Sequence, residues 1–474
     1  MTTMTAERTG PAFLEAPRGR SWREALADRA VTVVGLARSG VAACRLLAAL
    51  GARVTGTDTR AADALPPEVR ALGAEGVRLA VGGHPAQAFE AAELVVVSPG
   101  VPAGHPVLAD CRTRGVPVLG EVELAYRTMT AEFVAITGTN GKTTTTALTG
   151  ALLAESGRPV LVGGNIGRPL SAEALDFPAD GWVVAEVSSF QLETTDAFRP
   201  RVAAVLNVTP DHLDRHGTLA AYAEAKARIF RAQGPRDWAV LNADDPGAAA
   251  LAPRVRARLL WFSRREPVTQ GAWVRDGWVM LRLDAGDQPV CPVGDVFLRG
   301  AHNLENVLAA TACAGALGVT PERLRAAVRA FRAVPHRIEW IRERAGVAYY
   351  NDSKGTNVDA TLKALAAFDE PIVLIAGGRD KGQSFEALAA AARGRVKAAI
   401  VIGEGRATLG PALRGVTRVE EAASMSEAVG RAAALAVAGD VVLLSPACAS
   451  FDLFRDYEHR GAVFAEEVRA LPEP

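Results

Sequence analysis

Short apolar runs alternate with alanine-rich amphipathic stretches along almost the whole chain, and this alternation restricts the fold more than any other feature. Each run has the length of a buried strand, is followed by turn residues, and leads into a stretch with helical spacing of its apolar positions. Strands buried on both faces and joined by helices form parallel sheets. The sequence therefore predicts an α/β protein. The runs cover residues 31–36, 94–100, 133–138, 182–188, 202–208, 238–242, 371–378, 398–403 and 440–446.

The runs fall into three groups along the 474 residues, which is room for about three domains of ~150 residues. We expect three α/β domains, covering residues 1–122, 123–333 and 334–474. The first ~20 residues should form a loose tail. Between residues 255 and 300, the segments WFS, AWVRDGWVML and DVFLRG predict short antiparallel strands. Because ligands of parallel sheets bind where the strands end, the residues after each run are the candidates for a site.

Charge and cysteine usage exclude several classes of protein. The formal net charge is +0, so the chain lacks the basic field that attracts nucleic acid and the polybasic stretch that binds membranes. No run of about 18 apolar residues predicts a membrane span, and residues 1–27 lack the apolar core of a signal peptide. The five cysteines are too far apart to predict a zinc site or a disulfide framework, which fits a reducing cytoplasm.

Lysine is rare in this chain, since only six of the 53 lysine and arginine residues are lysine. Arginine is used wherever charge alone suffices, so a retained lysine indicates a need for a compact ammonium group that can lose its proton. Four of the six stand in segments that look like parts of a site, namely Lys142, Lys226, Lys354 and Lys381.

The strand expected at 133–138 leads into a glycine loop and a helix, with the sequence ITGTNGKTTTT. Backbone N–H groups of such a loop, together with the helix N-terminus, form a cradle for phosphate. Lys142 would reach the β and γ phosphates, and the Thr143 hydroxyl would ligate Mg²⁺. The spacing G-x-x-G-K-T departs from the usual G-x-x-x-x-G-K-[ST], and the alternative is a plain glycine turn before a helix.

The first apolar run also ends in a glycine turn, VTVVGLARSG, but Ala37 stands at the second glycine of G-x-G-x-x-G, so the dinucleotide fingerprint fails. The following strand nevertheless ends at Asp58, which suits a ribose or another diol. A further strand ends in Ser98, Pro99 and Gly100. The segment predicts a nucleotide-like ligand without a full NAD site, and the alternative is a set of ordinary tight turns.

Acidic and basic side chains follow the middle strands. Glu186 ends a strand near the phosphate loop, which suits a Mg²⁺ ligand, although such a glutamate often forms a cap or an ion pair. The segment NVTPDHLDRHG adds Asp211, His212 and Asp214, and Lys226 follows on a helix. An ammonium group has no lone pair for a metal, whereas a carbamate on Lys226 would offer two oxygens. A hydrogen-bonded turn histidine and a solvated helix lysine are the alternatives.

These motifs together resemble the Mur ligase family, which builds the peptide of bacterial cell-wall precursors. The resemblance covers nearly all of the chain past the tail and keeps the family's order. Besides the phosphate loop it rests on GGNIG, EVSSFQLE, NVTPDHLDRHG, AHNLEN, PHR, NDSKGTN and SPACASFDLFRDYEHRG. It implies a Rossmann-like N-terminal domain, a central P-loop-type ATPase domain and a C-terminal Rossmann-like domain.

Within the family, the chain most resembles the enzymes that add D-glutamate to UDP-N-acetylmuramoyl-L-alanine. The resemblance implies that ATP activates the substrate carboxylate as an acyl phosphate, which an amine then attacks. It implies two Mg²⁺ ions, the first held by Thr143 and Glu186, the second by His212 and a carbamylated Lys226. Lys142, His212 and Lys226 would be the catalytic residues of a cytoplasmic monomer that binds small molecules.

The remaining roles are implied residue by residue. The implied ATP contacts are Gly138, Thr139, Asn140, Gly141, Lys142, Thr143, Thr144, Asn303, Arg337 and Asp352. The implied contacts of the UDP-sugar are Gly35, Ser39, Gly40, Asp58, Thr59, Arg60, Ser98, Pro99, Gly100, Asn165 and His212. The implied D-glutamate contacts are Lys354, Thr356, Lys381, Ser450 and Tyr457.

Segments in the last third separate the possible relatives. GGRDKGQSF stands where enzymes that add a diamino acid carry D-N-P-R, and Tyr457 stands where phenylalanine is expected. Two lysines with hydroxyl groups suit the two carboxylates of D-glutamate. The alternatives are a sister ligase for L-alanine, a diamino acid or a folate glutamate, a P-loop regulatory or transport ATPase, and a dehydrogenase. The ATPase would not explain Lys226, Lys354 or Lys381, and Ala37 argues against the dehydrogenase.

Overall fold

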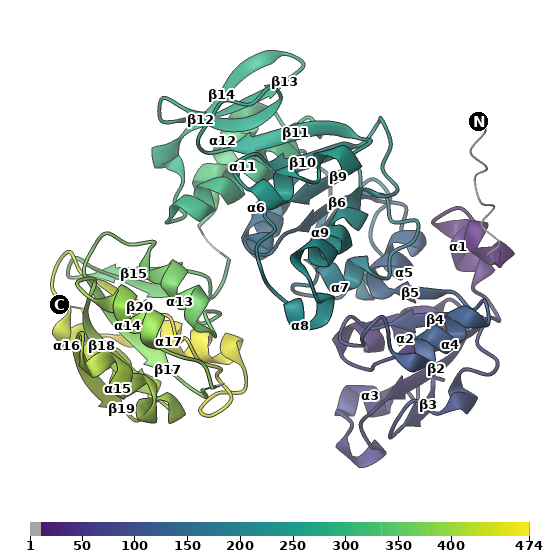
Figure 1. The fold of residues 1–474 in the computed structure, drawn as a ribbon, viewed down its shortest axis with the longest axis horizontal. Helices are drawn as coiled ribbons and strands as arrows, with labels where there is room; N and C mark the ends of the chain where they lie inside the picture. The colour runs from purple at the N-terminus through teal and green to yellow at the C-terminus, as the bar shows by residue number, and fades with distance from the viewer. Residues whose placement is uncertain (1–10, 333, 381, 474) are drawn as a thin grey trace. The chain divides into compact units, whose positions relative to one another are not determined.

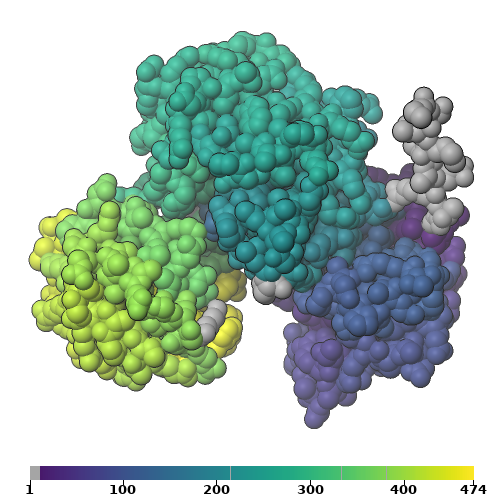
Figure 2. Space-filling model, in the orientation of Figure 1, coloured from purple at the N-terminus to yellow at the C-terminus, as the bar shows by residue number. Residues whose placement is uncertain are grey.

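The computed structural model describes residues 11–332, 334–380 and 382–473. The chain divides into two compact units. Unit 1 contains the residues up to Val293 together with Glu305–Val328, and unit 2 contains Gly294–Leu304 and the residues from Arg329 on. Three sheets form, and each belongs to its own range of residues, as the colours of Figure 1 show. Figure 2 gives the same residues as a space-filling view with the same colours. No helix in the described ranges is long and apolar enough to cross a membrane.

The first sheet of unit 1 is parallel throughout, with the strand order β3-β2-β1-β4-β5. This order is that of a Rossmann-like sheet, as predicted. Successive side chains of β4 enter different cores, because Leu94 and Val96 pack with helix α2 whereas Val95 and Val97 pack with Leu108 of α4. The elements are η1 Ala12–Glu15, α1 Arg20–Ala25, β1 Ala30–Val34, α2 Arg38–Ala49, β2 Arg53–Asp58, η2 Ala62–Ala64, α3 Pro67–Ala71, β3 Arg78–Val81, η3 Ala86–Ala88, β4 Leu94–Val97, α4 Pro106–Thr113, β5 Val118–Gly120 and α5 Glu121–Thr128.

The central sheet has the order β14-β13-β12-β11-β10-β9-β6-β8-β7 and is parallel from β7 to β12. The phosphate loop follows β6, a middle strand of this sheet (Figure 1). The elements are β6 Glu132–Thr137, α6 Lys142–Ala154, β7 Val160–Gly164, η4 Leu170–Ala172, β8 Trp182–Glu186, α7 Ser189–Leu192, β9 Val202–Val205, α8 Leu213–His216, α9 Leu219–Ala227, η5 Arg228–Phe230, β10 Trp238–Asn242, α10 Pro246–Ala249, η6 Ala252–Arg254, β11 Arg258–Ser263, β12 Gly271–Arg275, β13 Trp278–Leu283, β14 Gly286–Pro292, η7 Val293–Asp295, α11 Ala301–Gly315 and α12 Pro321–Ala330.

The prediction for residues 255–300 is partly wrong. WFS lies in β11, which pairs in parallel with both β10 and β12. AWVRDGWVML forms the antiparallel β12–β13 hairpin, as predicted, around Asp276 and Gly277 with φ angles of 50° and 74°. DVFLRG forms no strand, and the third antiparallel strand is β14. The apolar side chain of DVFLRG that suggested a strand, Phe297, packs instead against Trp340 within unit 2.

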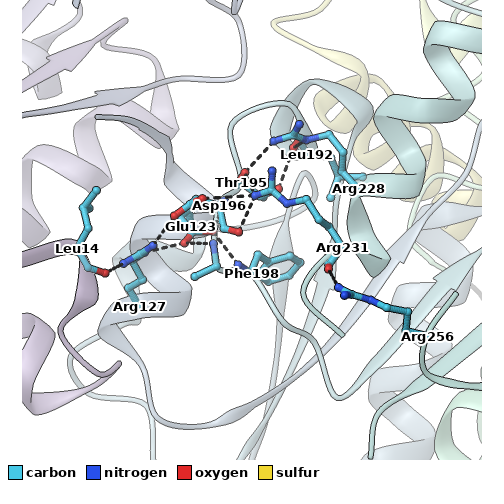
Figure 3. A network of polar contacts seen from close by, with 11 residues as sticks. Leu14, Glu123, Arg127, Leu192, Thr195, Asp196, Phe198, Arg228, Arg231 and Arg256 are labelled. Atoms are coloured by element: carbon cyan, nitrogen blue, oxygen red, sulfur yellow. Dashed lines mark hydrogen bonds and ion pairs between the residues drawn. The ribbon is translucent and has the colours of Figure 1, made fainter. Parts of the chain in front are cut away.

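A polar network joins α5, which follows the first sheet, to the segment after α7 of the central sheet (Figure 3). The fully buried Glu123 carboxylate accepts N–H bonds from Asp196, Ala197 and Phe198 at 2.9 to 3.0 Å. Arg127 donates to Glu123 at 2.6 Å and to Asp196 at 2.9 Å. Three N–H groups and a guanidinium therefore compensate the buried charge, which makes this a well-satisfied junction.

Unit 2 contains the third sheet, with the order β15-β16-β20-β17-β18-β19. Only β15 runs antiparallel to its neighbour, and the other strands pair in parallel. The third predicted α/β region is therefore confirmed. The elements are β15 Glu339–Arg344, β16 Val347–Asn351, α13 Val358–Leu365, β17 Ile372–Gly377, α14 Glu386–Ala392, β18 Val396–Ile402, η8 Glu404–Ala407, α15 Leu409–Arg414, β19 Arg418–Ala422, α16 Met425–Leu435, β20 Val441–Leu444 and α17 Tyr457–Ala470.

Every predicted apolar run contains a strand of the structure, although most strands end earlier than predicted because the trailing Ser, Gly and Pro residues form turns. The prediction of a loose tail is wrong for Ala12–Glu15 and untested before residue 11. Residues 1–10 lie outside the described residues, but Ala12–Glu15 forms η1 and buries Phe13. The domain boundaries after residues 122 and 333 stay predictions.

Candidate active site

The phosphate loop between β6 and α6 has the local structure that the sequence predicts. Gly141 has a φ of 82°, and a Cβ there would collide with the Asn306 side chain, so only glycine fits. The N–H groups of Thr139 and Asn140 donate to Asn207 Oδ1 at 3.0 and 2.8 Å. Asn207, which follows β9, is absent from the predicted set of site residues, and it holds the backbone of the loop in place.

Two lysines meet at one carbonyl of this loop. Lys142 Nζ donates to Gly138 O at 2.9 Å and to Thr139 O at 2.8 Å. Lys226 Nζ donates to the same Gly138 O at 2.8 Å. The start of α6 and the end of α9 therefore bring together two of the three residues predicted as catalytic. Because like charges repel, this arrangement favours loss of a proton from the more buried amine.

Lys226 is the more buried amine, with 1% of its surface exposed. Burial, the larger cause, and the charge of Lys142 together lower the pKa of Lys226 to about 6. The charge of Asp211 opposes this shift. Its Nζ lies 4.3 Å from the centroid of the Tyr222 ring. A lysine with this pKa is mainly an uncharged amine at neutral pH, and an uncharged amine is a nucleophile.

Glu186 ends β8 beside the strand that leads to the phosphate loop, and it is 2% exposed. Its Oε1 accepts from Asn165 Nδ2 at 2.8 Å, whereas its Oε2 has no hydrogen-bond partner among the described residues. Thr143, the second predicted ligand of the first ion, is buried at the start of α6. In the described parts of the chain, no group of three or more His, Cys, Asp and Glu side chains could hold a metal ion. A Mg²⁺ ion here would therefore need phosphate or water oxygens to complete its ligands.

His212 precedes α8 in the left-handed conformation, with a φ of 51°. Its ring is half exposed, and its Nε2 lies 3.7 Å from Asp211 Oδ2. The ring centroid lies 5.0 Å from that of Phe190 and 6.4 Å from that of Tyr222. Tyr222, which also contacts the Lys226 amine, therefore connects the two residues predicted to hold the second Mg²⁺.

A second histidine of the same segment, His216, is absent from the predicted set. Its Nε2 lies 3.0 Å from Ser189 Oγ, and its Nδ1 lies 3.4 Å from Glu193 Oε1. Burial lowers the pKa of His216. These contacts tie α8 to α7 and so position the segment that carries His212. The side chain of Asp214 lies outside the described part of this segment.

A cavity of about 610 Å³ lies at the carboxyl ends of the first-sheet strands and extends to the residues after β7. Gly40 and His212, although predicted, do not line it. Gly40 instead lets α2 approach the turn after β1, because a Cβ there would collide with Gly35 O. The predicted UDP-sugar contacts that line the cavity are Gly35, Ser39, Asp58, Thr59, Arg60, Ser98, Pro99, Gly100 and Asn165.

Asp58 organises one wall of this cavity. Its carboxylate accepts from Leu36 N at 2.8 Å and from Arg60 Nε at 2.8 Å, and the hydrogen bond from Arg60 holds the pKa of Asp58 well below its usual range. His84 and His105 also line the cavity, with ring centroids 5.3 Å apart, and burial lowers the pKa of His84. Both histidines are absent from the predicted set, because neither follows one of the predicted apolar runs directly.

A second cavity of about 720 Å³ adjoins the first, because the two share Ala37, Arg38, Arg60 and Pro169. Apolar residues of α2, among them Val41 and Leu46, line much of it. The shared residues make it an extension of the same binding region.

In unit 2, Asp352 follows β16 and accepts the Ser445 hydroxyl at 2.8 Å. Burial raises the pKa of Asp352 to about 7, against the opposing effects of that hydrogen bond and of Arg337 and Arg460. The predicted ATP contacts Asp352 and Arg337 are therefore close enough to interact. Asn303, the third of these contacts in unit 2, donates from Nδ2 to Arg299 O at 2.7 Å.

The residues predicted for D-glutamate follow β16, β17 and β20, which are neighbours in the third sheet. Lys354 Nζ lies 5.1 Å from the Tyr457 ring centroid, and Thr356 N donates to Lys354 O at 2.9 Å. Ser450 is buried on the segment after β20. Lys381 lies outside the described residues.

Arg460 of α17 joins two of these segments and is absent from the predicted set. The fully buried guanidinium donates from Nε to Ser353 Oγ at 3.0 Å, from Nη2 to Ser353 O at 2.8 Å and from Nη1 to Cys448 O at 3.1 Å. Burial lowers the pKa of Arg460 to about 10, so the group stays charged at neutral pH. It fixes the backbone beside Lys354 and Ser450.

Three family models match consecutive parts of the chain. They describe the Mur ligase MurD-like, N-terminal domain over residues 29–120, the Mur ligase middle domain over residues 136–314, and the Mur ligase, glutamate ligase domain over residues 336–448. The chain is 49% identical to the UDP-N-acetylmuramoylalanine--D-glutamate ligase of Acidobacterium capsulatum, over 94% of this chain and 97% of that protein. It is 48% identical to the protein of the same name from Koribacter versatilis, over 94% of this chain and 98% of that protein.

Solved structures of lower identity share the fold. The UDP-N-acetylmuramate-alanine ligase MurC of Thermotoga maritima matches with a TM-score of 0.57 and 19% identity, over 93% of this chain and 99% of that one. A pseudomurein peptide ligase type C from Methanothermus fervidus matches with a TM-score of 0.56 and 20% identity, over the same shares of the two chains.

Proposed function

The chain belongs to the Mur ligase family, and from this premise we propose that it is an ATP-dependent ligase that joins D-glutamate to UDP-N-acetylmuramoyl-L-alanine. The observation that carries the proposal is the meeting of Lys142 and the buried Lys226 at the Gly138 carbonyl of the phosphate loop, where burial lowers the pKa of Lys226 to about 6. A loop that only bound ATP would not need a second, neutral amine there. The name of the relatives at 49% and 48% identity supports D-glutamate as the amino acid.

The reaction forms one amide bond and consumes one ATP. The alanyl carboxylate attacks the γ-phosphorus, the bond to ADP breaks, and an acyl phosphate results. The amine of D-glutamate then attacks the acyl carbon, loses a proton, and expels inorganic phosphate. This order makes chemical sense because a free carboxylate is a poor electrophile, whereas an acyl phosphate has a good leaving group.

In the phosphate loop, Lys142 is placed to exchange the carbonyls of Gly138 and Thr139 for phosphate oxygens. Asn207 keeps the loop backbone fixed during this exchange through its bonds to Thr139 and Asn140. A movement of the Lys142 side chain would therefore open these carbonyls to the nucleotide.

Two Mg²⁺ ions belong to the proposal, and an observation on the donor atoms supports the first. Thr143 and Glu186 would hold the first, and the buried Glu186 Oε2, which lacks a partner among the described residues, supplies the free donor atom. Asn165 orients this carboxylate through its bond to Oε1. His212 and a carbamate on Lys226 would hold the second. When bound, the ions would offset negative charge on the phosphate that is transferred.

The burial of Lys226 supports the proposed carbamate. The neutral amine attacks the carbon of CO₂, an N–C bond forms, and one proton leaves, so that an anion with two oxygen donors results. A protonated amine cannot make this attack, and the pKa of about 6 supports the neutral form at pH 7. The amine nitrogen keeps one hydrogen, which can still be donated to the Gly138 carbonyl.

For D-glutamate we propose the side chains of Lys354, Thr356, Lys381, Ser450 and Tyr457. The neighbouring strand ends of the third sheet and the contact between Lys354 and Tyr457 support this assignment. Two ammonium groups would face the two carboxylates of the substrate. The α-amine of D-glutamate would be left to attack.

We also propose that the protein is a cytoplasmic monomer. All five cysteines lie in the described ranges, are buried, and take part in no disulfide bond, a state that a reducing compartment maintains. Light scattering of the purified protein should give the mass of one chain, 49.7 kDa. A mass of two chains would contradict the monomer.

The function is tested by phosphate release from ATP with UDP-N-acetylmuramoyl-L-alanine and a panel of D- and L-amino acids. We expect release that depends on both D-glutamate and the UDP-sugar, with the amide product visible by mass spectrometry. Release with L-alanine or a diamino acid instead would indicate a sister ligase. Release that needs no amino acid would indicate a plain ATPase.

A further inference from the structure

A basic pocket of about 360 Å³ lies in unit 1 where α9 ends. None of its lining residues lines the two cavities described above. Four arginines dominate it, and one carboxylate opposes them. The lining residues are Glu224, Ala227, Arg228, Arg231, Arg254 and Arg256.

Backbone carbonyls hold the two inner arginines in place (Figure 3). Arg228 donates from Nε to Leu192 O at 2.7 Å and from Nη2 to Thr195 O at 2.9 Å. Arg231 donates from Nη2 to Thr195 O at 2.8 Å and to Asp196 O at 2.6 Å. A carbonyl is a neutral acceptor, so these bonds fix the guanidinium groups without cancelling their charge.

The two outer arginines, Arg254 and Arg256, also use only some of their N–H donors in hydrogen bonds. Arg254 donates from Nη2 to Glu224, and Arg256 donates from Nη2 to Arg231 O. Each guanidinium carries five N–H donors. Across the ranges that the structure describes, Nη1 of all four arginines and Nε of Arg231, Arg254 and Arg256 have no hydrogen-bond acceptor. These donors are available to a ligand with several oxygens.

The local charge is positive. Glu224 is the one acid of the lining, and the nearby Asp196, which contacts Arg231 at 3.6 Å, is shared with Arg127. Burial lowers the pKa of Arg228, and the charge of Arg231 is the second cause, whereas Glu193, Asp196 and Glu123 oppose the shift. Glu193 and Glu123 are themselves paired with Arg215 and Arg127. The free protein therefore holds like charges close together, and an anion between them would offset the repulsion.

We propose that this pocket binds a small multivalent oxyanion of the inorganic phosphate class. Planar guanidinium groups match pairs of phosphate oxygens, and four of them converge here around a space large enough for such an ion. Ala227, which lines the pocket, lies between Arg228 and Lys226. An anion in the pocket would therefore act on the end of the helix that carries the reactive lysine.

The test is equilibrium dialysis with radiolabelled inorganic phosphate at low ionic strength. All variants carry Lys142→Ala, which weakens the competing phosphate loop. Arg254→Ala with Arg256→Ala should weaken phosphate binding by about tenfold or more, because it removes two of the four guanidinium groups that line the pocket. The matched control is Arg20→Ala with Arg414→Ala, which removes two exposed arginines that also pair with glutamates. It should leave the dissociation constant within about twofold.

Glu224→Gln gives a result in the opposite direction that a folding defect could not produce. It removes the carboxylate that competes for Arg254, so phosphate should bind more tightly. The proposal is overturned if the Lys142→Ala protein binds no phosphate, or if both double variants lose binding equally. It is also overturned if Glu224→Gln leaves the affinity unchanged.

Discussion

Lys226 of unit 1 and Asp352 of unit 2 are both buried beside a candidate site, with 1% and 7% of their surfaces exposed, but they differ in partners. Burial is the largest cause of both pKa shifts, to about 6 for Lys226 and about 7 for Asp352. Lys226 donates to a single carbonyl beside another cation, whereas Asp352 accepts a hydroxyl and has two arginines nearby. The difference teaches that burial decides the charge state in both units, and that opposite charges nearby only moderate it.

The two shifts link folding to pH in opposite directions. The folded pKa of Lys226 lies below its ordinary 10.5, so the unfolded chain binds more protons between pH about 6 and 10.5, and stability rises with pH there. The folded pKa of Asp352 lies above its ordinary 3.8, so unit 2 binds more protons when folded. Its contribution to stability is complete below pH 3.8 and is lost as pH rises through about 7.

The largest expected effect concerns the neutral amine. Lys226→Arg should lower the rate of ligation by about 10³-fold, because a guanidinium stays charged and cannot add CO₂. Steady-state phosphate release measures this, with Lys397→Arg, a surface lysine paired with Asp440, as the unaffected control. Short carboxylic acids should partly restore Lys226→Ala. Activity of Lys226→Arg close to that of the unchanged protein would rule out the carbamate.

Removing the Arg460 cation separates the effect of burial on the pKa of Asp352 from the effect of nearby charge. Arg460→Leu should destabilise unit 2 by about 3 kcal/mol, because Ser353 and Cys448 lose buried donors. It should also raise the pKa of Asp352 further. Hydrogen exchange of β16 and β20 amides measures the stability. Arg414→Ala, at an exposed ion pair, should change it by less than about 0.5 kcal/mol, and an equal effect of both variants would contradict the role of Arg460.

Asp352→Asn keeps the shape of the side chain and removes its titration. The free energy of unfolding of unit 2 should then no longer fall between pH 3.8 and about 7, and above pH 7 the variant should be the more stable protein. Urea unfolding at several pH values, followed by exchange of unit 2 amides, measures this. The exposed Asp359→Asn is the control and should keep the original slope. A variant with the same slope as the unchanged protein would show that Asp352 is ionised throughout.

The smallest expected effect is that of Glu123, a buried carboxylate that accepts hydrogen bonds from three backbone N–H groups and from Arg127. Glu123→Gln should cost about 1.5 kcal/mol, because one amide oxygen replaces a carboxylate that accepts three N–H groups and a guanidinium. Thermal unfolding of unit 1 measures this. Glu75→Gln, at an exposed pair with Arg45, should change stability by less than about 0.5 kcal/mol. Equal effects of the two substitutions would mean that the junction is not energetically special.

The predicted apolar runs contain most of the strands that are buried on both faces, but they miss the inner strand β16 and several strands at the margins of the sheets. β3, β5, β7 and β19 are all terminal strands of their sheets, and each carries partly exposed residues. A half-exposed strand lacks the continuous apolar run on which the prediction relied. The strand predicted at DVFLRG was wrong because the apolar Phe297 packs against Trp340 from a loop and not from a strand.

In the candidate site, the sequence predicted the residues whose side chains could react or bind a metal. It did not predict a role for the residues that hold the backbone of the site in place. Lys142, Glu186 and Lys226 stand out by type and motif. Asn207 and Arg460 lie inside the quoted segments NVTPDHLDRHG and SPACASFDLFRDYEHRG, but no role was predicted for either. Their roles depend on backbone atoms from distant segments, such as Asn140 for the first and Cys448 for the second. Such contacts exist only after folding, so no local pattern encodes them.

The hydrogen bond from Lys142 to the Gly138 carbonyl affects how a nucleotide would bind to the loop. Lys142 already lies across its own loop and neutralises the same oxygens that would otherwise repel an incoming triphosphate. A phosphate group would therefore replace two backbone carbonyls as the partners of the Lys142 ammonium group. We therefore expect the rate of nucleotide binding to depend on how fast the Lys142 side chain leaves the carbonyls of Gly138 and Thr139.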